Sequence, residues 1–295
     1  MSFKSYNPKE LSLPEIHGFM LSSVAPRPIA LASTVDKDGA VNLAPFSQFN
    51  VFSTNPPIMI FSASVSGRTG ETKDTYKNIK ENAEVVINIV EYDMVFQTSY
   101  ASSEFKRGIN EFEKANFTQL ASELVRPPRV GESPVNFECK VNQVIEFGNV
   151  GGSGNIFICE VVKIHINERV LDANGKIDPL KINQAGRCGG GYYVALDPSK
   201  MFEIAQPQAN IGIGIDVLDT KIKNSKVLTG NNLGQLALNL DFPTTEEIED
   251  FKKTESYKYL NAFEGEERTL QFHKAAQEML MSHNIKLALT ALYAI

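Results

Sequence analysis

The stretch Pro26-Arg27-Pro28-Ile29-Ala30-Leu31-Ala32-Ser33-Thr34 opens the part of the chain that decides the fold. Residues 29–35 form an apolar, partly β-branched run that is typical of a strand, and the turn Asp36-Lys37-Asp38-Gly39 follows it directly. Aspartate and glycine tolerate positive φ, so this turn predicts a hairpin whose second strand runs from Val41 to Phe52. Antiparallel pairing is therefore expected from the start of the fold.

The strand pattern continues through the first two thirds of the chain. Asn55-Pro56-Pro57 interrupts it, and the wholly apolar run 58–61 resumes it, which predicts a strand buried on both faces. Further strands are expected over 85–90, 137–147 and 156–166, with the glycine-rich segment 148–154 as a hairpin connection and 187–193 closing the β region. Short strands and tight turns favour a mainly β, antiparallel barrel over a doubly wound parallel sheet.

Helical segments flank this β region. A helix is expected over 75–82, and the mixed, polar segment 92–118 is expected to hold helical pieces. The composition changes after about Pro207, where 246–263 and 267–294 are rich in helix formers, with an interruption near Ser282-His283-Asn284. We therefore expect two parts, a β domain over 1–207 and a mostly helical C-terminal extension over 208–295.

Composition bounds the class of protein. The 295 residues are 42% hydrophobic and 22% charged, which is ordinary for a globular protein. A formal charge of -6 gives no basic field for nucleic acid, so nucleic acid is not an expected partner. No window approaches the roughly 18 apolar residues of a membrane span, and the first residues lack an apolar targeting run, so we expect no membrane partner and a cytoplasmic location.

Cysteine and histidine spacing argues against a metal centre or a disulfide framework. Cys139, Cys159 and Cys188 lie far apart with no CxxC pair, and the first two fall in runs expected to be buried strands. His17, His165, His273 and His283 show no metal-ligand spacing. We expect free thiols and assign no metal.

Hydroxyl groups and cations suggest a phosphate-bearing ligand. Ser47, Ser62 and Ser64 lie at expected strand ends, and Arg68 and Lys73 stand close to the expected helix start. Hydroxyls, backbone amides and cations at a helix start are what a phosphate ester requires. The plainer alternatives are serines that bond to nearby turns and a solvated charge pair at the helix start. Similarly, Arg27 between two prolines could serve only as an ordered strand entry.

A family resemblance rests on several motifs in sequence order. The runs PRPIALASTVDKDGAVNLAPFSQFN, NPPIMIFSAS, KDTYKNIKENAEVVINIV and GRCGGGYY resemble the flavin reductase-like, FMN-binding split-barrel family, including its flavoredoxin-like branch, over roughly residues 14–207. The resemblance implies a six-stranded Greek-key barrel, a homodimer, FMN as cofactor, and hydride transfer between NAD(P)H and the flavin. It also implies a redox protein or a flavin-dependent monooxygenase as partner. No acid, base or nucleophile is required of the protein, because the flavin carries the redox step.

The resemblance assigns residues to the expected site. Ser47 to Asn50 would line the isoalloxazine, Ser62 and Ser64 would reach the ribityl chain or phosphate, and Arg68 and Lys73 would take the phosphate charge. Arg187 and Tyr193 would lie where the nucleotide substrate approaches, beside glycines 189–191 that leave room for a flat ring. The full expected cofactor set is Arg27, Ser47, Gln48, Phe49, Asn50, Ser62, Ser64, Arg68, Thr69, Lys73 and Asp74.

The residues leave three functions open. No GxGxxG follows a strand, so the chain encodes no separate Rossmann domain for NAD(P)H. The alternatives are an NAD(P)H:flavin oxidoreductase, an FMN-containing electron carrier that serves a protein partner, and a binding module that has lost flavin. The extension after residue 207 could cover the flavin, enlarge the dimer interface or recruit a partner.

Overall fold

A computed structural model describes residues 2–204, 214–239 and 241–295. The chain divides into two compact units, residues 1–201 and 202–295, which are described separately below. The domain boundary expected at residue 207 lies outside the described residues. In the described part of the chain, every helix is too short or too polar to cross a lipid bilayer.

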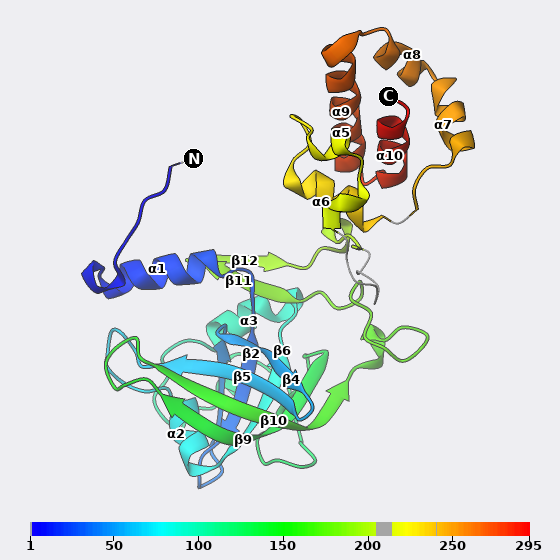
Figure 1. Cartoon of the computed structure of the whole chain (residues 1–295). Helices are drawn as coiled ribbons and strands as arrows, with labels where there is room; N and C mark the ends of the chain where they lie inside the picture. The colour runs from blue at the N-terminus through cyan, green and yellow to red at the C-terminus, as the bar shows by residue number, and fades with distance from the viewer. Residues whose placement is uncertain (1, 205–213, 240) are drawn as a thin grey trace. The chain divides into compact units, whose positions relative to one another are not determined.

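A seven-stranded antiparallel sheet forms the first unit (Figure 1). Its strands are β2 (Ala30–Val35), β3 (Val41–Phe46), β4 (Phe49–Thr54), β5 (Pro57–Ser64), β6 (Glu84–Ile89), β9 (Val135–Glu146) and β10 (Gly154–Ile166). Their order is β3-β2-β6-β9-β10-β5-β4. The two outer strands follow one another in the chain, with only Ser47 and Gln48 between them, so one bent segment supplies both edges of the sheet.

Two details of the expected strands are wrong. The predicted strand over 41–52 is broken at Ser47 and Gln48, and counting β3 and β4 as one bent strand yields the six strands that the resemblance implies. The run 58–61 is not buried on both faces, because Met59 and Phe61 are buried whereas Ile58 and Ile60 are half-buried. Its apolar residues thus alternate between the core and the other face of the sheet.

Two hydrophobic clusters stabilise this unit. In the first, Phe61 packs against Phe157 with ring centroids 4.8 Å apart, together with buried residues of β2, β6 and β9. The second joins Leu31 and Leu43 to the segments that follow β6, including the fully buried Phe112. Burying one such side chain contributes about 1.5–3 kcal/mol, so these clusters dominate the stability of the unit.

Smaller elements surround the sheet. They are the α-helices α1 (Leu13–Ser23), α2 (Asp74–Glu81), α3 (Val95–Tyr100) and α4 (Glu111–Lys114); the 3-10 helices η1 (Pro8–Glu10), η2 (Tyr92–Met94), η3 (Glu168–Val170) and η4 (Pro198–Lys200); the two-stranded pair β7 (Gln119–Leu120) and β8 (Arg129–Val130); and the three-stranded sheet of β1 (Arg27–Pro28), β11 (Ala185–Gly189) and β12 (Tyr192–Ala195). Helix α1 contacts β11 of this small sheet (Figure 1).

Helix α1 was not predicted from the sequence, although its start carries a recognisable capping box. The backbone amide of Ser12 donates to the Glu15 carboxylate at 2.9 Å, and this carboxylate also accepts from the Ser12 hydroxyl. The pattern Ser-x-x-Glu before an apolar run is an N-terminal helix motif. None of the residues of α1 is buried, so its position depends on specific contacts at its two ends.

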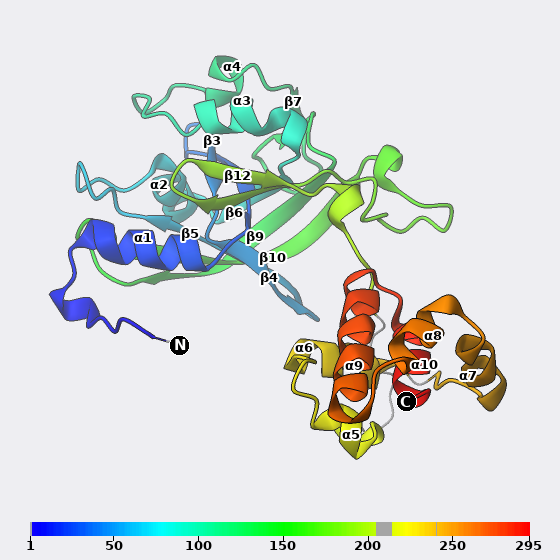
Figure 2. The same ribbon diagram turned by 90° about the horizontal axis from the view of Figure 1, so that it is seen from above.

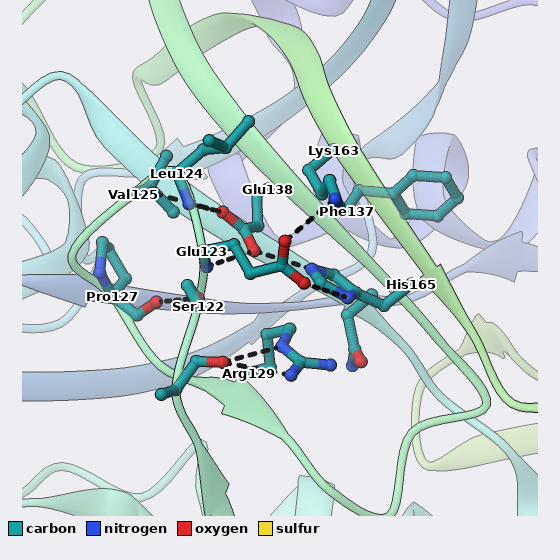
Figure 3. Close-up of polar contacts among 12 residues, drawn as sticks. Ser122, Glu123, Leu124, Val125, Pro127, Arg129, Phe137, Glu138, Lys163 and His165 are labelled. Carbon is teal, nitrogen blue, oxygen red and sulfur yellow. Dashed lines mark hydrogen bonds and ion pairs between the residues drawn. The ribbon is translucent and has the colours of Figure 1, made fainter.

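A buried carboxylate on β9 holds the loop at residues 123–125 against the sheet of the first unit (Figure 3). Glu138 on β9 is fully buried and accepts hydrogen bonds from the backbone amides of Glu123 at 2.8 Å and Leu124 at 2.6 Å. His165 on β10 lies 2.7 Å from the same carboxylate. Burial alone would raise the pKa of Glu138, but these donors hold it below its usual value. Both carboxylate oxygens of Glu138 therefore accept hydrogen bonds, and these bonds hold the loop in place.

The second unit is helical (Figure 2). It contains η5 (Gly214–Val217), α5 (Thr220–Lys223), α6 (Gly230–Leu238), α7 (Thr245–Lys252), α8 (Glu255–Asn261), α9 (Gly265–Met281) and α10 (Ile285–Tyr293). The helical segment expected over 246–263 is two helices, α7 and α8. The interruption predicted near residues 282–284 is confirmed between α9 and α10, where His283 has a φ of 57°.

Candidate functional site

A pocket of about 300 Å³ lies between β3, the first turn of α2 and the loops 66–73 and 101–107. We call it the β3–α2 pocket. Ala44, Pro45 and Phe46 of β3 give it one apolar wall, and loop hydroxyls and charged side chains line the rest. Because β3 is an outer strand of the sheet, its free edge is accessible to the segments that complete the pocket.

Ser66 organises the first loop. Its hydroxyl oxygen accepts from the backbone amides of Arg68 at 3.3 Å and Thr69 at 3.1 Å, while its own amide donates to the Glu71 carbonyl at 2.9 Å. Gly70 has a φ of 71°, which glycine adopts without strain. Sequence reasoning overlooked Ser66, although a serine bonding to amides two and three residues ahead is a recognised turn pattern.

Helix α2 is fixed to the sheet through buried polar groups. The Asn42 amide nitrogen donates to the Thr75 hydroxyl at 2.9 Å, and the Asn78 amide nitrogen donates to the Thr34 hydroxyl at 3.1 Å. Lys73 stands at the N-cap position, and its side chain makes no capping bond. These bonds hold the first turn of α2 at the pocket. The N-cap side chain makes no hydrogen bond to the backbone amides of that turn.

Charges at the pocket are mostly paired. Asp74 contacts the Lys77 ammonium at 3.3 Å and the Arg107 guanidinium at 3.5 Å, and Arg107 also reaches Glu81 at 3.4 Å. Lys73 lines the pocket but forms no ion pair among the residues that the structure describes. It is therefore a cation whose charge is not offset by a contacting carboxylate.

Three further carboxylates line the pocket, and one of them, Glu71 in the first loop, forms no ion pair among the residues that the structure describes. Glu104, in the second loop, is bound to the guanidinium of Arg68. Glu111 of α4 is buried, and it accepts from the backbone amide of Leu43 at 2.9 Å on the free edge of β3. Burial raises the pKa of Glu111, and the Leu43 amide opposes this effect. Glu111 thus satisfies an edge amide that would otherwise lack a partner.

Arg27 lies outside this pocket and fastens α1. Its side chain is only 6% exposed, and it donates to the backbone carbonyls of Leu21 and, at 2.7 Å, Val24, at the C-terminal end of α1. Its Nε lies 3.5 Å from the hydroxyl of Ser47, in the bend between β3 and β4. A guanidinium is favourable at this end of a helix, so Arg27 positions α1 against the bend.

Arg187 and Tyr193 lie next to Arg27. Arg187 pairs with Arg27 across β1 and β11, and its guanidinium carbon lies 4.7 Å from the centre of the Tyr193 ring. Burial lowers the pKa of Arg27, and the charge of Arg187 lowers it further. We call Arg27, Ser47, Arg187 and Tyr193 the Arg27 corner, a place where two cations adjoin.

The remaining expected cofactor residues lie on β4 and β5, except Gln48, which lies in the bend before β4. Phe49 and Asn50 line a second, mostly apolar pocket of about 320 Å³, and the Gln48 carbonyl accepts from the amide of Ser62 at 2.9 Å. Ser64 is exposed at the end of β5. Of the expected cofactor residues, the structure brings Thr69, Lys73 and Asp74 together in the β3–α2 pocket and leaves Arg68 bonded at its edge.

The surroundings of the glycines at 189–191 explain only one of them by close packing. A Cβ at Gly189 would lie 2.7 Å from the Ser22 hydroxyl oxygen, and the φ of Gly189 is 102°, so this glycine permits the close approach of α1. A Cβ at Gly191 would meet nothing within 4 Å.

Cys139 and Cys159 are buried free thiols, as predicted. Within residues 2–204, 214–239 and 241–295, no three His, Cys, Asp or Glu side chains gather as a metal-ligand cluster.

Comparison with known proteins establishes the family. The pattern described as "Flavin reductase like domain" matches residues 21–184, which is more than half of the chain. The chain therefore belongs to the flavin reductase-like family, as the motifs in its sequence indicated, and the helical unit lies beyond the matched residues.

The chain is also similar to individual proteins. An uncharacterized protein of Aquifex aeolicus (strain VF5) is 37% identical over 187 residues, which cover 63% of this chain and 92% of that protein. Nitrilotriacetate monooxygenase component B from Bacillus cereus superposes with a TM-score of 0.64 at 29% identity, over 69% of this chain and all of that one. The 2-nitrobenzoate 2-nitroreductase NbaA of Pseudomonas fluorescens superposes at 0.62 and 25% identity, over 72% of this chain and all of that one.

Proposed function

We propose that the protein binds FMN in the β3–α2 pocket and catalyses hydride transfer between NAD(P)H and this flavin. The observation that carries the proposal is Lys73, which lines the pocket at the N-cap of α2 and has no carboxylate partner among the described residues. A phosphate group there would gain a charge-assisted contact and the favourable end of the helix dipole. Family membership supports a flavin as the bearer of this phosphate.

The volume and the lining of the pocket support FMN as the ligand. Its volume of about 300 Å³ lies at the lower end of the range for small-molecule sites, about 300–1,000 Å³. Ala44, Pro45 and Phe46 offer an apolar wall to a flat ring, and the loop held by Ser66 offers polar groups at the phosphate end. When bound, FMN supplies the hydride chemistry, so the protein has to bind and orient it.

We assign the protein's own residues accordingly. Lys73, with Thr69 and the first-turn amides at Asp74, would hold the phosphate. Residues 47–50 do not line the β3–α2 pocket, and we propose that the ring extends beyond it, past Phe46, so that Ser47, Gln48, Phe49 and Asn50 contact the ring. Ser62 and Ser64 are proposed for the ribityl chain, with Arg68 as a second phosphate ligand.

The nicotinamide nucleotide is proposed to approach the Arg27 corner. Arg187 and Arg27 adjoin there, and no carboxylate is paired with either in the described part of the chain. Both cations attract the phosphates of a dinucleotide, and Arg187 is the one proposed to contact them, because Arg27 is buried and bonded to the carbonyls of α1. The aromatic ring of Tyr193 adds an exposed face beside them.

A homodimer is also part of the proposal. Val51 and Phe52 on β4 are exposed, Phe52 to 64%, and they adjoin the apolar pocket lined by Phe49 and Met59. Exposed apolar groups of this kind are characteristic of interfaces. The Bacillus cereus neighbour is component B of a monooxygenase, which supports a flavin-dependent monooxygenase as a partner that receives reduced flavin.

An absorbance titration tests the proposed activity. The purified protein, loaded with FMN, is titrated anaerobically with NADPH and then with NADH, and bleaching of the flavin band by either nucleotide is the expected result. Flavin that bleaches only with dithionite would contradict the reductase function and favour the electron carrier. Failure to bind added FMN would contradict the whole proposal.

The phosphate assignment has its own variant. Lys73→Ala should weaken FMN binding roughly tenfold or more, because a hydrogen bond to a charged group contributes about 1.5–3 kcal/mol. Riboflavin, which lacks the phosphate, should bind both proteins alike. Lys80→Ala is the matched control, since Lys80 lies on the same helix but pairs with Glu146 and does not line the pocket. Equal FMN affinity for wild type and Lys73→Ala would exclude Lys73 from the phosphate site.

A further inference from the structure

Arg68 and Glu104 connect the two loops that line the β3–α2 pocket. Ser66 and Thr69 line the pocket on the Arg68 side, and Ser103 and Phe105 line it beside Glu104. The Arg68 guanidinium donates from Nη2 to the Glu104 carboxylate. The side chains of Arg68 and Glu104 are 71% and 51% exposed, so the ion pair lies at the solvent edge of the pocket.

The charges at the pocket explain why this pair matters. A phosphate monoester carries about -1.5 to -2 at neutral pH, more than one ammonium group offsets. Lys73 supplies one cation without a contacting carboxylate, whereas Arg107 is engaged by Asp74 and Glu81. Lys77, which also lines the pocket, is paired with Asp74 at 3.3 Å, a carboxylate that is 22% exposed, whereas Arg68 is held only by the more exposed carboxylate of Glu104. A second cation is therefore obtained most easily by releasing Arg68 from Glu104.

We propose that Glu104 is a specificity-determining residue that competes with the ligand phosphate for Arg68. The inference rests on the proposed function, because it takes FMN as the ligand. An exposed ion pair has little net strength in water, and a guanidinium can instead donate two parallel hydrogen bonds to a phosphate. Glu104 is half exposed, so it regains water when Arg68 leaves it. A flavin without a phosphate has nothing with which to displace Glu104.

The competition differs from simple repulsion between Glu104 and the phosphate. Repulsion acts whether or not Arg68 is present, because it depends only on the two negative charges. Competition requires Arg68, since it is the shared partner. Removing Glu104 in the presence and in the absence of Arg68 separates the two effects.

The test measures FMN and riboflavin affinity by quenching of flavin fluorescence. The proteins are wild type, Glu104→Gln, Arg68→Ala and the double variant, with Glu113→Gln as control, because Glu113 is exposed on α4 and does not line the pocket. Glu104→Gln should tighten FMN binding about two- to fivefold. It should leave riboflavin affinity unchanged, and it should produce no tightening when Arg68 is alanine. Glu104→Ser also removes the carboxylate, and we expect the same results for it.

Three results would overturn the competition: unchanged FMN affinity in Glu104→Gln, the same gain for riboflavin as for FMN, or the same gain in the Arg68→Ala background. Each of these is observed with a wild-type protein that binds FMN. A wild-type protein that binds no FMN would instead overturn the proposed function, and the competition with it.

Discussion

At the scale of single residues, a buried histidine in the helical unit is sensitive to protonation. His273 on α9 is 3% exposed, and its Nδ1 lies 2.7 Å from the Ser225 hydroxyl oxygen. The same hydroxyl oxygen accepts from the amides of Val227 and Leu228, which leaves its proton free to be donated to Nδ1. Nε2 is buried without a partner among the described residues, so a charged ring would be poorly solvated.

This environment predicts a loss of stability in mild acid. Burial lowers the pKa of His273 in the folded protein. As the pH falls below the unfolded value of about 6.5, the unfolded chain binds a proton that the folded chain does not, so the free energy of unfolding decreases. One such group contributes a slope of at most about 1.4 kcal/mol per pH unit.

Urea unfolding of the full chain at pH 7.5 and pH 5.5 measures this effect. His273→Asn keeps an acceptor near the position of Nδ1 but does not titrate, so its unfolding free energy should depend less on pH than that of the wild type. His283→Asn is the control, because His283 lies in the exposed turn after α9. An unaltered pH dependence in His273→Asn would show that other groups govern the acid response.

At the scale of elements, α1 shows how a helix with no buried residue is held in place. Arg27 bonds to the carbonyls at its C-terminal end, and Gly189 lets β11 approach Ser22. Leu13 at its other end fills space beside Gly67 and Gly152. Few apolar contacts and several specific close approaches make α1 a low-stability element that depends on small residues in its neighbours.

Gly189→Ala should therefore loosen α1. The new Cβ would lie 2.7 Å from the Ser22 hydroxyl oxygen and 3.0 Å from its Cα, at a φ of 102° that side chains rarely adopt. We expect a loss of about 1–3 kcal/mol in the free energy of unfolding. Hydrogen exchange should also show faster exchange of the α1 amides.

Gly191→Ala is the matched control for this variant. It adds the same methyl group two residues away, where nothing lies within 4 Å and φ is not positive. Its stability should stay within about 0.5 kcal/mol of wild type, as for most surface substitutions. Equal effects of the two variants would contradict the role assigned to Gly189.

At the scale of the whole molecule, each unit has its own core. The first unit buries clusters around Phe61 and Phe112, and the second buries clusters around Leu289 and Phe272. Among the described residues, those that line the β3–α2 pocket all come from the first unit. The residues proposed to bind the flavin therefore all belong to the first unit.

A fragment of residues 1–201 should fold and bind FMN within about twofold of the full-length affinity. Each unit is large enough to bury a core of its own, and the fragment retains both clusters of the first unit. Fluorescence titration measures the affinity, and cooperative thermal unfolding verifies the fold. A fragment that folds but loses FMN would show that the helical unit contributes to the site.

Analytical sedimentation of the 1–201 fragment and of the full-length chain measures their oligomeric states. If β4 forms the proposed dimer interface, the fragment should remain dimeric. A dimeric full-length chain with a monomeric fragment would instead assign the interface to residues 202–295.

Local patterns in the sequence predicted most of the β region. The hairpin at residues 36–39 and the strands β6, β9 and β10 were correct because alternation and turn residues act over a few neighbouring positions. The break at Ser47 and Gln48 was missed because nothing in those side chains interrupts a strand. The chain bends there so that β3 and β4 can form the two outer edges of one sheet, and this depends on the order of all seven strands.

The sequence by itself determined the family, the antiparallel sheet and the proximity of Thr69, Lys73 and Asp74, since these residues lie within one loop and helix start. Only the tertiary structure decided what completes the pocket. Glu111 reaches the Leu43 amide and Glu104 reaches Arg68 across gaps of 68 and 36 residues. Such contacts arise when distant segments pack together to bury apolar surface, and no local pattern of residue types records which segments will meet.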